Sequence, residues 1–322
     1  MEVKFRKLGS TGLEVSVLCY GTAFWGARTS EEEAKKIFYF CIERGVNFFD
    51  TAEVYGSYLG QAEEILGKFL KESGLRDKLI ISSKVHGYRD GRYQSKKEIL
   101  ECIDASLKRL NTDYLDIYFL HWPDPYTPIE EVLQTMDELV KVGKVRFVGM
   151  SNYQSWEVYE AIQICKEKGF SFPSVLQEIF NLVDFDVNIE KYNLAKRFDL
   201  GYMAYSPLAS GFLTGKYRKD KPVPEDTRGS LLSGWEKKRW LFRFTDYGWK
   251  ILDKVEEFAK KYNVSISQFA IAAILCFDGV SCVIDGSRTL EQLKENIRFL
   301  DITIDKKDFE ELLELCYFLK KE

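Results

Sequence analysis

The chain has 322 residues, of which 45% are hydrophobic and 30% charged, a composition typical of a globular protein with a large buried core. Its formal net charge of −4 gives no overall attraction to nucleic acid or to an anionic membrane, so an anionic ligand must be held by local positive groups. Seven scattered cysteines, only two histidines and no Cys-x-x-Cys pair disfavour a metal site and indicate reduced thiols in a cytoplasmic protein. We expect no signal segment and no membrane span, because the first residues are charged and no apolar run is long enough.

The first elements along the chain are a hairpin and a helix. Two short alternating runs within residues 3–20, joined by turn residues 9–12, predict a β-hairpin that leads into a first strand near residues 15–20. Ser30 followed by Glu33 has the form of a capping box, which predicts a helix that ends at Gly45.

From residue 46 onward, predicted strands and helices alternate. Short apolar runs predict strands at residues 46–50, 79–84, 114–119, 145–150, 174–178, 201–205 and 281–284. Helical spacing of apolar residues predicts helices at residues 61–72, 95–109, 129–142, 154–168, 188–197, 249–262, 266–276, 289–299 and 306–319. Such alternation implies parallel strands, because a parallel neighbour needs a crossover of about a dozen residues.

Eight parallel strands in one chain favour an α/β fold of the (β/α)8 (TIM) barrel type, with residues 1–322 as a single domain. The alternative is an open doubly wound sheet, but its usual G-x-G-x-x-G phosphate loop does not follow the first strand at residues 21–26. One connection is exceptional, because more than forty residues lie between the seventh predicted strand at 201–205 and the helix predicted at 249–262. A loop of that length is usually functional or disordered.

Four polar residues stand at or near predicted strand ends and would meet at one edge of a barrel: Asp50, Tyr55, Lys84 and His121. A free tyrosine has a pKa near 10, too high for efficient proton transfer at neutral pH, and a nearby ammonium such as Lys84 would lower it. Asp50 would balance the lysine charge, and a neutral His121 can donate a hydrogen bond to a carbonyl oxygen. A proton donor without a nucleophile suits hydride transfer from a nicotinamide.

Motifs that recur in order along nearly the whole chain resemble the aldo-keto reductase superfamily. They are Asp50-Thr-Ala-x-x-Tyr-Gly56, Ser83-Lys84, Leu120-His121-Trp-Pro-Asp124, Gly149-Met-Ser-Asn152, Gln177-x-x-x-Asn181, Ala204-Tyr-Ser-Pro-Leu208 and Gly286-Ser-Arg288 with Glu295-Asn296. The long connection, with the run from Tyr205 to Tyr217, is most similar to the branch that contains potassium-channel β subunits and bacterial general reductases.

The resemblance implies reduction of aldehydes or ketones to alcohols on a (β/α)8 barrel, with hydride from nicotinamide C4 of NADPH. Tyr55 would be the general acid, Asp50 and Lys84 would tune its pKa, and His121 would orient the carbonyl. The residues implied to bind the cofactor are Ser151, Asn152, Gln177 and Tyr205 at the nicotinamide, Ser206, Leu208, Gly211, Leu213, Gly215 and Lys216 at the pyrophosphate, and Gly286, Ser287, Arg288, Gln292, Glu295 and Asn296 at the adenosine end.

The chain departs from the family at Asp285, where proline is usual. An acid beside a phosphate-binding segment costs affinity unless it points away. NADPH is therefore the expected cofactor, and NADH stays possible.

Aromatic side chains in predicted loops at the same edge would form a hydrophobic substrate pocket: Trp25, Tyr58, His86, Tyr88, Trp122 and Trp235. We expect a small-molecule carbonyl substrate of open identity and no nucleic-acid or membrane partner, while an oligomer is possible but not implied. Two alternatives remain. One is a nicotinamide-sensing regulatory subunit with slow turnover, and the other is a non-redox barrel with Lys84 as a Schiff-base amine, which conflicts with the placement of the tyrosine.

Overall fold

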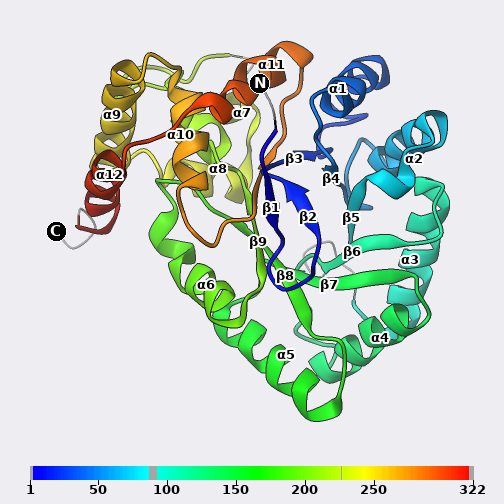
Figure 1. Ribbon diagram of the computed structural model, residues 1–322. Helices are drawn as coiled ribbons and strands as arrows, with labels where there is room; N and C mark the ends of the chain where they lie inside the picture. The colour runs from blue at the N-terminus through cyan, green and yellow to red at the C-terminus, as the bar shows by residue number, and fades with distance from the viewer. Residues whose placement is uncertain (1–2, 87–92, 226, 319–322) are drawn as a thin grey trace.

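The computed structural model describes residues 3–86, 93–225 and 227–318, and it confirms the closed (β/α)8 barrel. The barrel strands are β3 (Leu18–Gly21), β4 (Phe48–Asp50), β5 (Ile80–Val85), β6 (Leu115–Leu120), β7 (Val145–Ser151), β8 (Pro173–Ile179), β9 (Gly201–Tyr205) and β10 (Cys282–Asp285). Neighbouring strands are parallel, and β10 pairs with both β9 and β3 to close the ring. All eight strands therefore end at one edge, which we call the C-terminal rim (Figure 1).

A hairpin covers the opposite end of the barrel. β1 (Phe5–Lys7) pairs antiparallel with β2 (Glu14–Ser16), as the alternating runs predicted. Leu8, Leu13 and Val15 of this hairpin are buried in the same apolar cluster as the side chains that fill the barrel. Those interior residues include Cys19, Phe48, Ile117, Phe119, Val175, Met203 and Cys282. The N-terminal end of the barrel is thus closed by packed side chains.

Helices surround the barrel largely where the sequence predicted them. They are α1 (Glu31–Glu43), α2 (Gln61–Ser73), α3 (Lys96–Leu110), α4 (Ile129–Lys141), α5 (Ser155–Lys168), α6 (Phe185–Phe198), α9 (Asp246–Lys261), α10 (Ile266–Leu275), α11 (Leu290–Asn296) and α12 (Lys306–Phe318), with short 3₁₀ turns η1 (Arg76–Lys78) and η4 (Ile297–Asp301). One half of the predicted capping box is seen at α1, where the Ser30 side chain accepts a hydrogen bond from the Glu33 amide, while the Glu33 carboxylate accepts from the Leu290 amide at 2.7 Å. Within the part of the chain that the structure describes, no helix combines the length and apolar character needed to cross a membrane.

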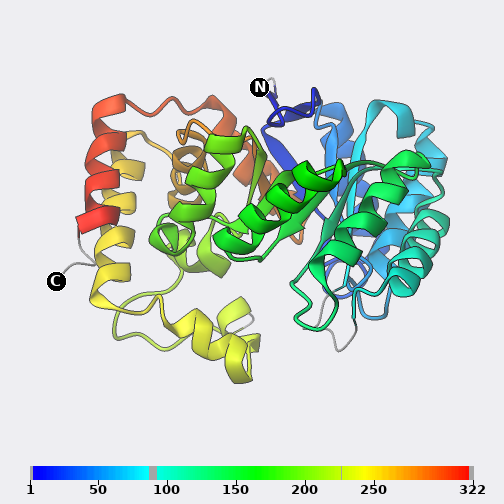
Figure 2. The same cartoon turned by 90° about the horizontal axis from the view of Figure 1, so that it is seen from below.

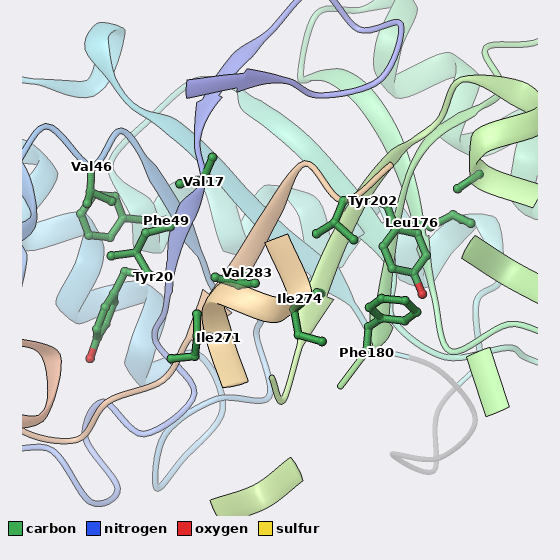
Figure 3. Packing of buried hydrophobic residues seen from close by; sticks show 14 of the residues in the cluster. Val17, Tyr20, Val46, Phe49, Leu176, Phe180, Tyr202, Ile271, Ile274 and Val283 are labelled. Carbon is green, nitrogen blue, oxygen red and sulfur yellow. The ribbon is translucent and has the colours of Figure 1, made fainter. Parts of the chain in front are cut away.

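The main hydrophobic core lies between the outer face of the strands and these helices. Figure 3 shows residues of this cluster from strands, such as Tyr202 and Val283, together with Ile271 and Ile274 of α10. Phe180 packs its ring within 5.6 Å, between centroids, of several neighbouring aromatic rings. Because removing one buried aromatic side chain typically costs about 3–5 kcal/mol, this layer holds the strand ends firmly in place.

The connection after β9 contains more structure than the sequence indicated. It forms η3 (Ala209–Thr214), α7 (Arg228–Leu231) and α8 (Gly234–Leu241), and α9 then begins at residue 246 rather than 249. In Figure 2 this segment projects at the end of the molecule opposite the hairpin. Aromatic rings pack within it, with Trp240 and Phe244 at 4.3 Å between centroids. These side chains, spaced irregularly along the chain, gave no helical period that would have predicted the short helices.

Helices α2 and α3 approach closely at Gly67. A β-carbon at this position would lie 2.1 Å from the Arg109 carbonyl oxygen. We therefore expect Gly67→Ala to lower the free energy of unfolding by about 1–3 kcal/mol in urea titrations followed by circular dichroism. Alanine normally stabilises a helix interior by about 0.5–1 kcal/mol relative to glycine, so a gain in stability would contradict this close packing. The exposed Lys71→Ala on the same helix serves as the control.

Candidate active site

The C-terminal rim brings together the four residues predicted to deliver a proton. Asp50 ends β4, Lys84 is the penultimate residue of β5, and His121 directly follows β6. These three strands are neighbours in the barrel. Tyr55 lies in the turn after β4, where its amide donates to the Ala52 carbonyl oxygen at 3.1 Å. Four residues spread over seventy positions of sequence therefore occupy one site.

Asp50 and Lys84 form a buried ion pair. Lys84 Nζ lies 2.6 Å from Asp50 Oδ2 and donates a second hydrogen bond to the Thr51 carbonyl oxygen at 2.7 Å. The other carboxylate oxygen of Asp50 accepts hydrogen bonds from Ser82 Oγ at 2.7 Å and from Gln177 Nε2 at 2.8 Å. Because each charge has several partners, the pair keeps one geometry although both side chains are almost fully buried.

The Lys84 ammonium lies next to the Tyr55 ring, with Nζ 4.9 Å from the ring centroid. Burial alone would lower the pKa of Lys84, but the Asp50 carboxylate and the Tyr55 side chain outweigh it, so the pKa is raised above its usual value. Lys84 is therefore cationic at neutral pH. A fixed cation beside a phenol favours its ionised form, which is what an acid–base tyrosine needs.

His121, at the end of β6, faces Tyr55. Their ring centroids are 5.9 Å apart and their planes nearly perpendicular, at 83°. The His121 carbonyl oxygen accepts a hydrogen bond from Asn152 Nδ2 at 2.9 Å, which ties this corner to the end of β7. The half-buried Trp122 follows, 6.2 Å from His121 between centroids, so an apolar surface lies beside the polar pair.

The residues predicted to hold the nicotinamide form a hydrogen-bond chain across β7, β8 and β9. Ser151 Oγ donates to the Gln177 carbonyl oxygen at 2.7 Å, and Asn152 Nδ2 donates to Ser151 Oγ at 2.9 Å. Tyr205 Oη donates to Asn152 Oδ1 at 2.6 Å. The bond from Gln177 to Asp50 connects this chain to the ion pair, so the predicted cofactor and proton-transfer residues share one network.

Two supporting residues were not predicted from the sequence. Ser82 binds Asp50, as described above, and Glu178 accepts a hydrogen bond from the Asn152 amide at 2.8 Å while pairing with Lys191 at 2.7 Å. The Glu178 contact holds Asn152 in a left-handed conformation with φ 65°. A charged residue is unusual in a buried strand, and this feature of Glu178 could have identified it from the sequence.

The residues predicted at the pyrophosphate lie in a turn of unusual backbone conformation. Ser206, Ala209, Ser210 and Gly211 all have φ between 50° and 90°, and η3 is interrupted there. The amides of Ala209 and Gly211 donate to the carbonyl oxygens of Ser206 and Leu208 at 2.9 and 2.8 Å, so the turn is held by its own backbone hydrogen bonds. Lys216 crosses this turn, because a β-carbon at Gly211 would lie 2.9 Å from its Nζ. Leu208 and Leu213 pack against or within the hydrophobic core.

At the predicted adenosine end, Asp285 points inward. Its carboxylate accepts hydrogen bonds from the Ser287 amide at 2.7 Å and from Asn296 Nδ2 at 2.8 Å. Burial raises the pKa of Asp285 above its usual value, opposed by these hydrogen bonds. Asp285 thus organises the turn at Gly286 and Ser287. Asn296 directs its side-chain Nδ2 to the same turn, where it donates to Asp285 and to Ser287 Oγ.

Arg288 lies two residues before the start of α11, preceding the N-cap residue Thr289, and its side chain is partly exposed. Its amide donates to Gln292 Oε1 at 3.0 Å, while its carbonyl oxygen accepts from Thr29 Oγ1 at 3.0 Å. Glu295 is exposed on α11, and its carbonyl oxygen accepts a hydrogen bond from Gln268. The Arg288 backbone is therefore held at both its amide and its carbonyl group, while the side chain is partly exposed.

The predicted substrate pocket needs correction at two aromatic positions. Trp25 is completely buried, donates a hydrogen bond to Tyr20 Oη at 3.3 Å and packs on Phe69, so it belongs to the core. His86 is 1% exposed and contacts Glu53 instead of facing the rim. Trp122 lies beside His121, and Tyr58 is 56% exposed with its hydroxyl bonded to Glu64. Tyr88 and the Trp235 side chain lie outside what the structure describes.

Fold and site together define a (β/α)8 barrel whose C-terminal rim holds the buried Asp50–Lys84 ion pair beside Tyr55. The sequence model of the aldo/keto reductase family matches residues 17–316. The chain is also 34% identical, over 306 residues, to the probable voltage-gated potassium channel subunit beta of Oryza sativa subsp. japonica, which covers 93% of this chain and 92% of that protein. The chain belongs to the aldo/keto reductase family, whose members typically use NAD(P)H.

We expect Lys84→Met to lower the free energy of unfolding by about 3–5 kcal/mol, because it leaves the Asp50 carboxylate buried without its cation. The exposed pair Lys35–Glu72 provides a control, and Lys35→Met should cost less than about 1 kcal/mol. Since the pKa of Lys84 is raised on folding, its contribution is fully present below the unfolded pKa of about 10.4 and is lost as pH rises through the folded value. Urea titrations at several pH values measure both effects, and equal costs for the two variants would contradict the prediction.

Proposed function

We propose that this protein reduces aldehydes or ketones to alcohols, with NADPH as the hydride donor and Tyr55 as the general acid. The observation that carries the proposal is the buried Lys84 ammonium, paired with Asp50 and placed 4.9 Å from the Tyr55 ring centroid. Because this cation favours the phenolate, it lowers the cost of proton release from Tyr55. Tyr55, Lys84 and Asp50 would thus supply the proton transfer that a carbonyl reduction requires.

In the proposed reaction, Tyr55 gives its proton to the carbonyl oxygen while the adjacent carbon is reduced. Lys84 stabilises the phenolate that remains, and Asp50 keeps Lys84 charged and in place. His121 donates a hydrogen bond to the same carbonyl oxygen and orients it between the two facing rings. A bound nicotinamide supplies the hydride to the carbonyl carbon.

The residues at the rim suit a phosphorylated dinucleotide. The turn at residues 206–211, held by its own backbone hydrogen bonds, is where the pyrophosphate is predicted, and Lys216 adds a cation across it. Arg288 at the start of α11 suits a further phosphate, since both its guanidinium and the helix N-terminus attract an anion. Asp285 points away from that surface, which removes the objection to NADPH raised by its charge.

We assign the substrate side of the site to Trp122 beside His121, with Tyr58 at its margin. The half-buried Trp122 ring offers an apolar surface next to the proposed proton donors. An aldehyde or ketone with a small aromatic or aliphatic group would cover this ring and leave its oxygen toward Tyr55.

A second candidate function is a nicotinamide-sensing regulatory subunit with slow turnover. It is favoured by the relative from rice, whose name describes a probable potassium channel β subunit. Oxidation of NADPH in the presence of a reactive aromatic aldehyde distinguishes the two. Many turnovers per chain support the reductase, whereas tight cofactor binding with a single slow turnover supports the regulatory subunit.

We expect Tyr55→Phe to lower kcat by about 100-fold or more, because the ring stays but the transferable proton is lost. Binding of NADPH, followed by quenching of intrinsic fluorescence, should change little. Tyr159→Phe is the matched control, since this exposed tyrosine lies on the outer helix α5 and not at the C-terminal rim. Unchanged kcat in Tyr55→Phe would exclude this residue as the acid.

We expect Arg288→Ala to raise the KM for NADPH by about 10- to 100-fold and to change the KM for NADH much less, because a charge-assisted hydrogen bond to phosphate contributes about 1.5–3 kcal/mol. The exposed Arg298→Ala on η4 should leave both values near those of the natural protein. Equal increases for the two cofactors would assign Arg288 a structural role instead.

A further inference from the structure

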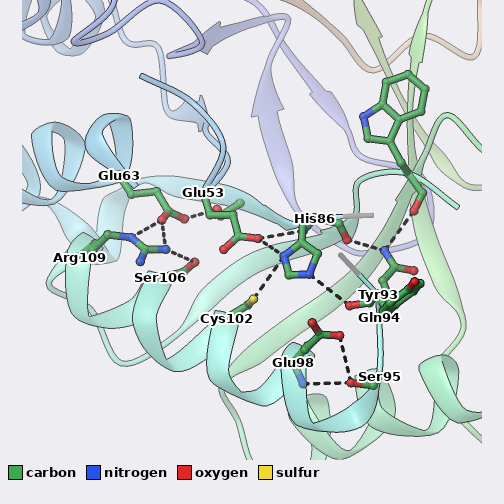
Figure 4. Close-up of polar contacts among 12 residues, drawn as sticks. Glu53, Glu63, His86, Tyr93, Gln94, Ser95, Glu98, Cys102, Ser106 and Arg109 are labelled. Atoms are coloured by element: carbon green, nitrogen blue, oxygen red, sulfur yellow. Dashed lines mark hydrogen bonds and ion pairs between the residues drawn. The ribbon is translucent and has the colours of Figure 1, made fainter. Parts of the chain in front are cut away.

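Three metal-binding side chains from three elements meet on the outer side of the barrel wall. Glu53 lies in the connection after β4, His86 directly follows β5, and Cys102 lies on α3. They are 2%, 1% and 7% exposed, and one ligand atom of each lies within 4.8 Å of the other two. Figure 4 shows Glu53 and Cys102 approaching the same nitrogen of the His86 ring.

The contacts of the imidazole place an acceptor opposite other electron-rich groups. His86 Nε2 lies 3.2 Å from the Tyr93 carbonyl oxygen, a contact that is a hydrogen bond when Nε2 carries the ring proton. In a neutral imidazole, Nδ1 then presents a lone pair, yet it lies 2.5 Å from Glu53 Oε1 and 3.5 Å from Cys102 Sγ. Either a proton shared among these groups or a metal ion between them would hold the three atoms this close together.

We propose that Glu53, His86 and Cys102 bind a zinc ion or a similar thiophilic divalent metal ion. Carboxylate oxygen, imidazole nitrogen and thiolate sulfur are the three ligand types that zinc uses in proteins. Tetrahedral zinc with Zn–N of about 2.0 Å and Zn–S of about 2.3 Å places nitrogen and sulfur about 3.5 Å apart. Nδ1 and Sγ are already at that separation. The carboxylate has to retreat to about 3.3 Å from Nδ1, by a rotation of the Glu53 side chain that also moves Oε1 relative to the His86 amide, from which it accepts a hydrogen bond at 3.0 Å.

The surroundings orient His86 in the way that metal-binding histidines are usually oriented. A proton on the distal Nε2 would point at the Tyr93 carbonyl oxygen, and this tautomer leaves Nδ1 for the metal. Gln94 Nε2 donates to the His86 carbonyl oxygen at 2.8 Å, so the backbone at this position is held as well. A water molecule would complete the tetrahedron, because three protein ligands leave one position open.

The proposed metal site adjoins the reaction centre along the chain. Glu53 stands between Asp50 and Tyr55, and His86 is two residues after Lys84. A metal ion there would tie the two connections that carry the catalytic tyrosine and lysine to α3. The site does not depend on the proposed reductase activity, and it is tested without it.

The test titrates Co²⁺ into the metal-free, full-length protein under reducing conditions and records the absorption spectrum. We expect one equivalent to produce a thiolate-to-cobalt charge-transfer band and the visible bands of tetrahedral cobalt, and Zn²⁺ to displace both. Zinc should also raise the melting temperature, since a ligand that binds only the folded state stabilises it. Absence of a charge-transfer band at saturating cobalt would overturn the proposal and leave a proton between Glu53 and His86.

Variants assign the ligands. Cys102→Ala should abolish the charge-transfer band, and His86→Gln should weaken cobalt binding at least tenfold. Cys165→Ala, which removes another buried thiol on α5, is the matched control and should keep the full spectrum. Circular dichroism verifies that each variant is folded. A band that survives in folded Cys102→Ala, or disappears in Cys165→Ala, would place the metal elsewhere and contradict the assignment.

Discussion

The buried pair of Asp50 and Lys84 is the interaction on which the rest of the site depends. Removing two charges from water costs several kcal/mol for each ion, and this cost is recovered only when every polar atom finds a partner. Here the partners come from β5, from β8 and from the backbone after β4, namely Ser82, Gln177 and the Thr51 carbonyl oxygen. The requirement to satisfy one ion pair therefore fixes the relative positions of three strand ends.

The same pair connects the residues proposed for proton transfer to those predicted to bind the cofactor. Gln177 contacts Asp50 through its side chain and Ser151 through its backbone, and the chain of hydrogen bonds continues through Asn152 to Tyr205. A dinucleotide that contacts these side chains would act on the surroundings of Asp50. Because these groups are held by one another as well as by the barrel, the site is arranged before any ligand arrives.

The sequence predicted the barrel and the four rim residues well, because both follow from local patterns. Buried parallel strands read as apolar runs, and polar residues at their ends must meet in a closed barrel. The direction of individual side chains was not accessible. Trp25 and His86 stand in predicted loops yet turn into the protein, and Asp285 proved to be a buried organiser of its turn. Such outcomes depend on contacts such as Trp25 with Phe69, which are distant in sequence and follow no period.

The hairpin that closes the N-terminal end of the barrel has a kinetic consequence. Leu8, Leu13 and Val15 pack at that end against the side chains that fill the barrel. A ligand therefore reaches the rim residues from the C-terminal side and not through the barrel. Under the proposed reaction, a cofactor and a substrate would both enter from this side, so the one that binds deeper would have to bind first and leave last.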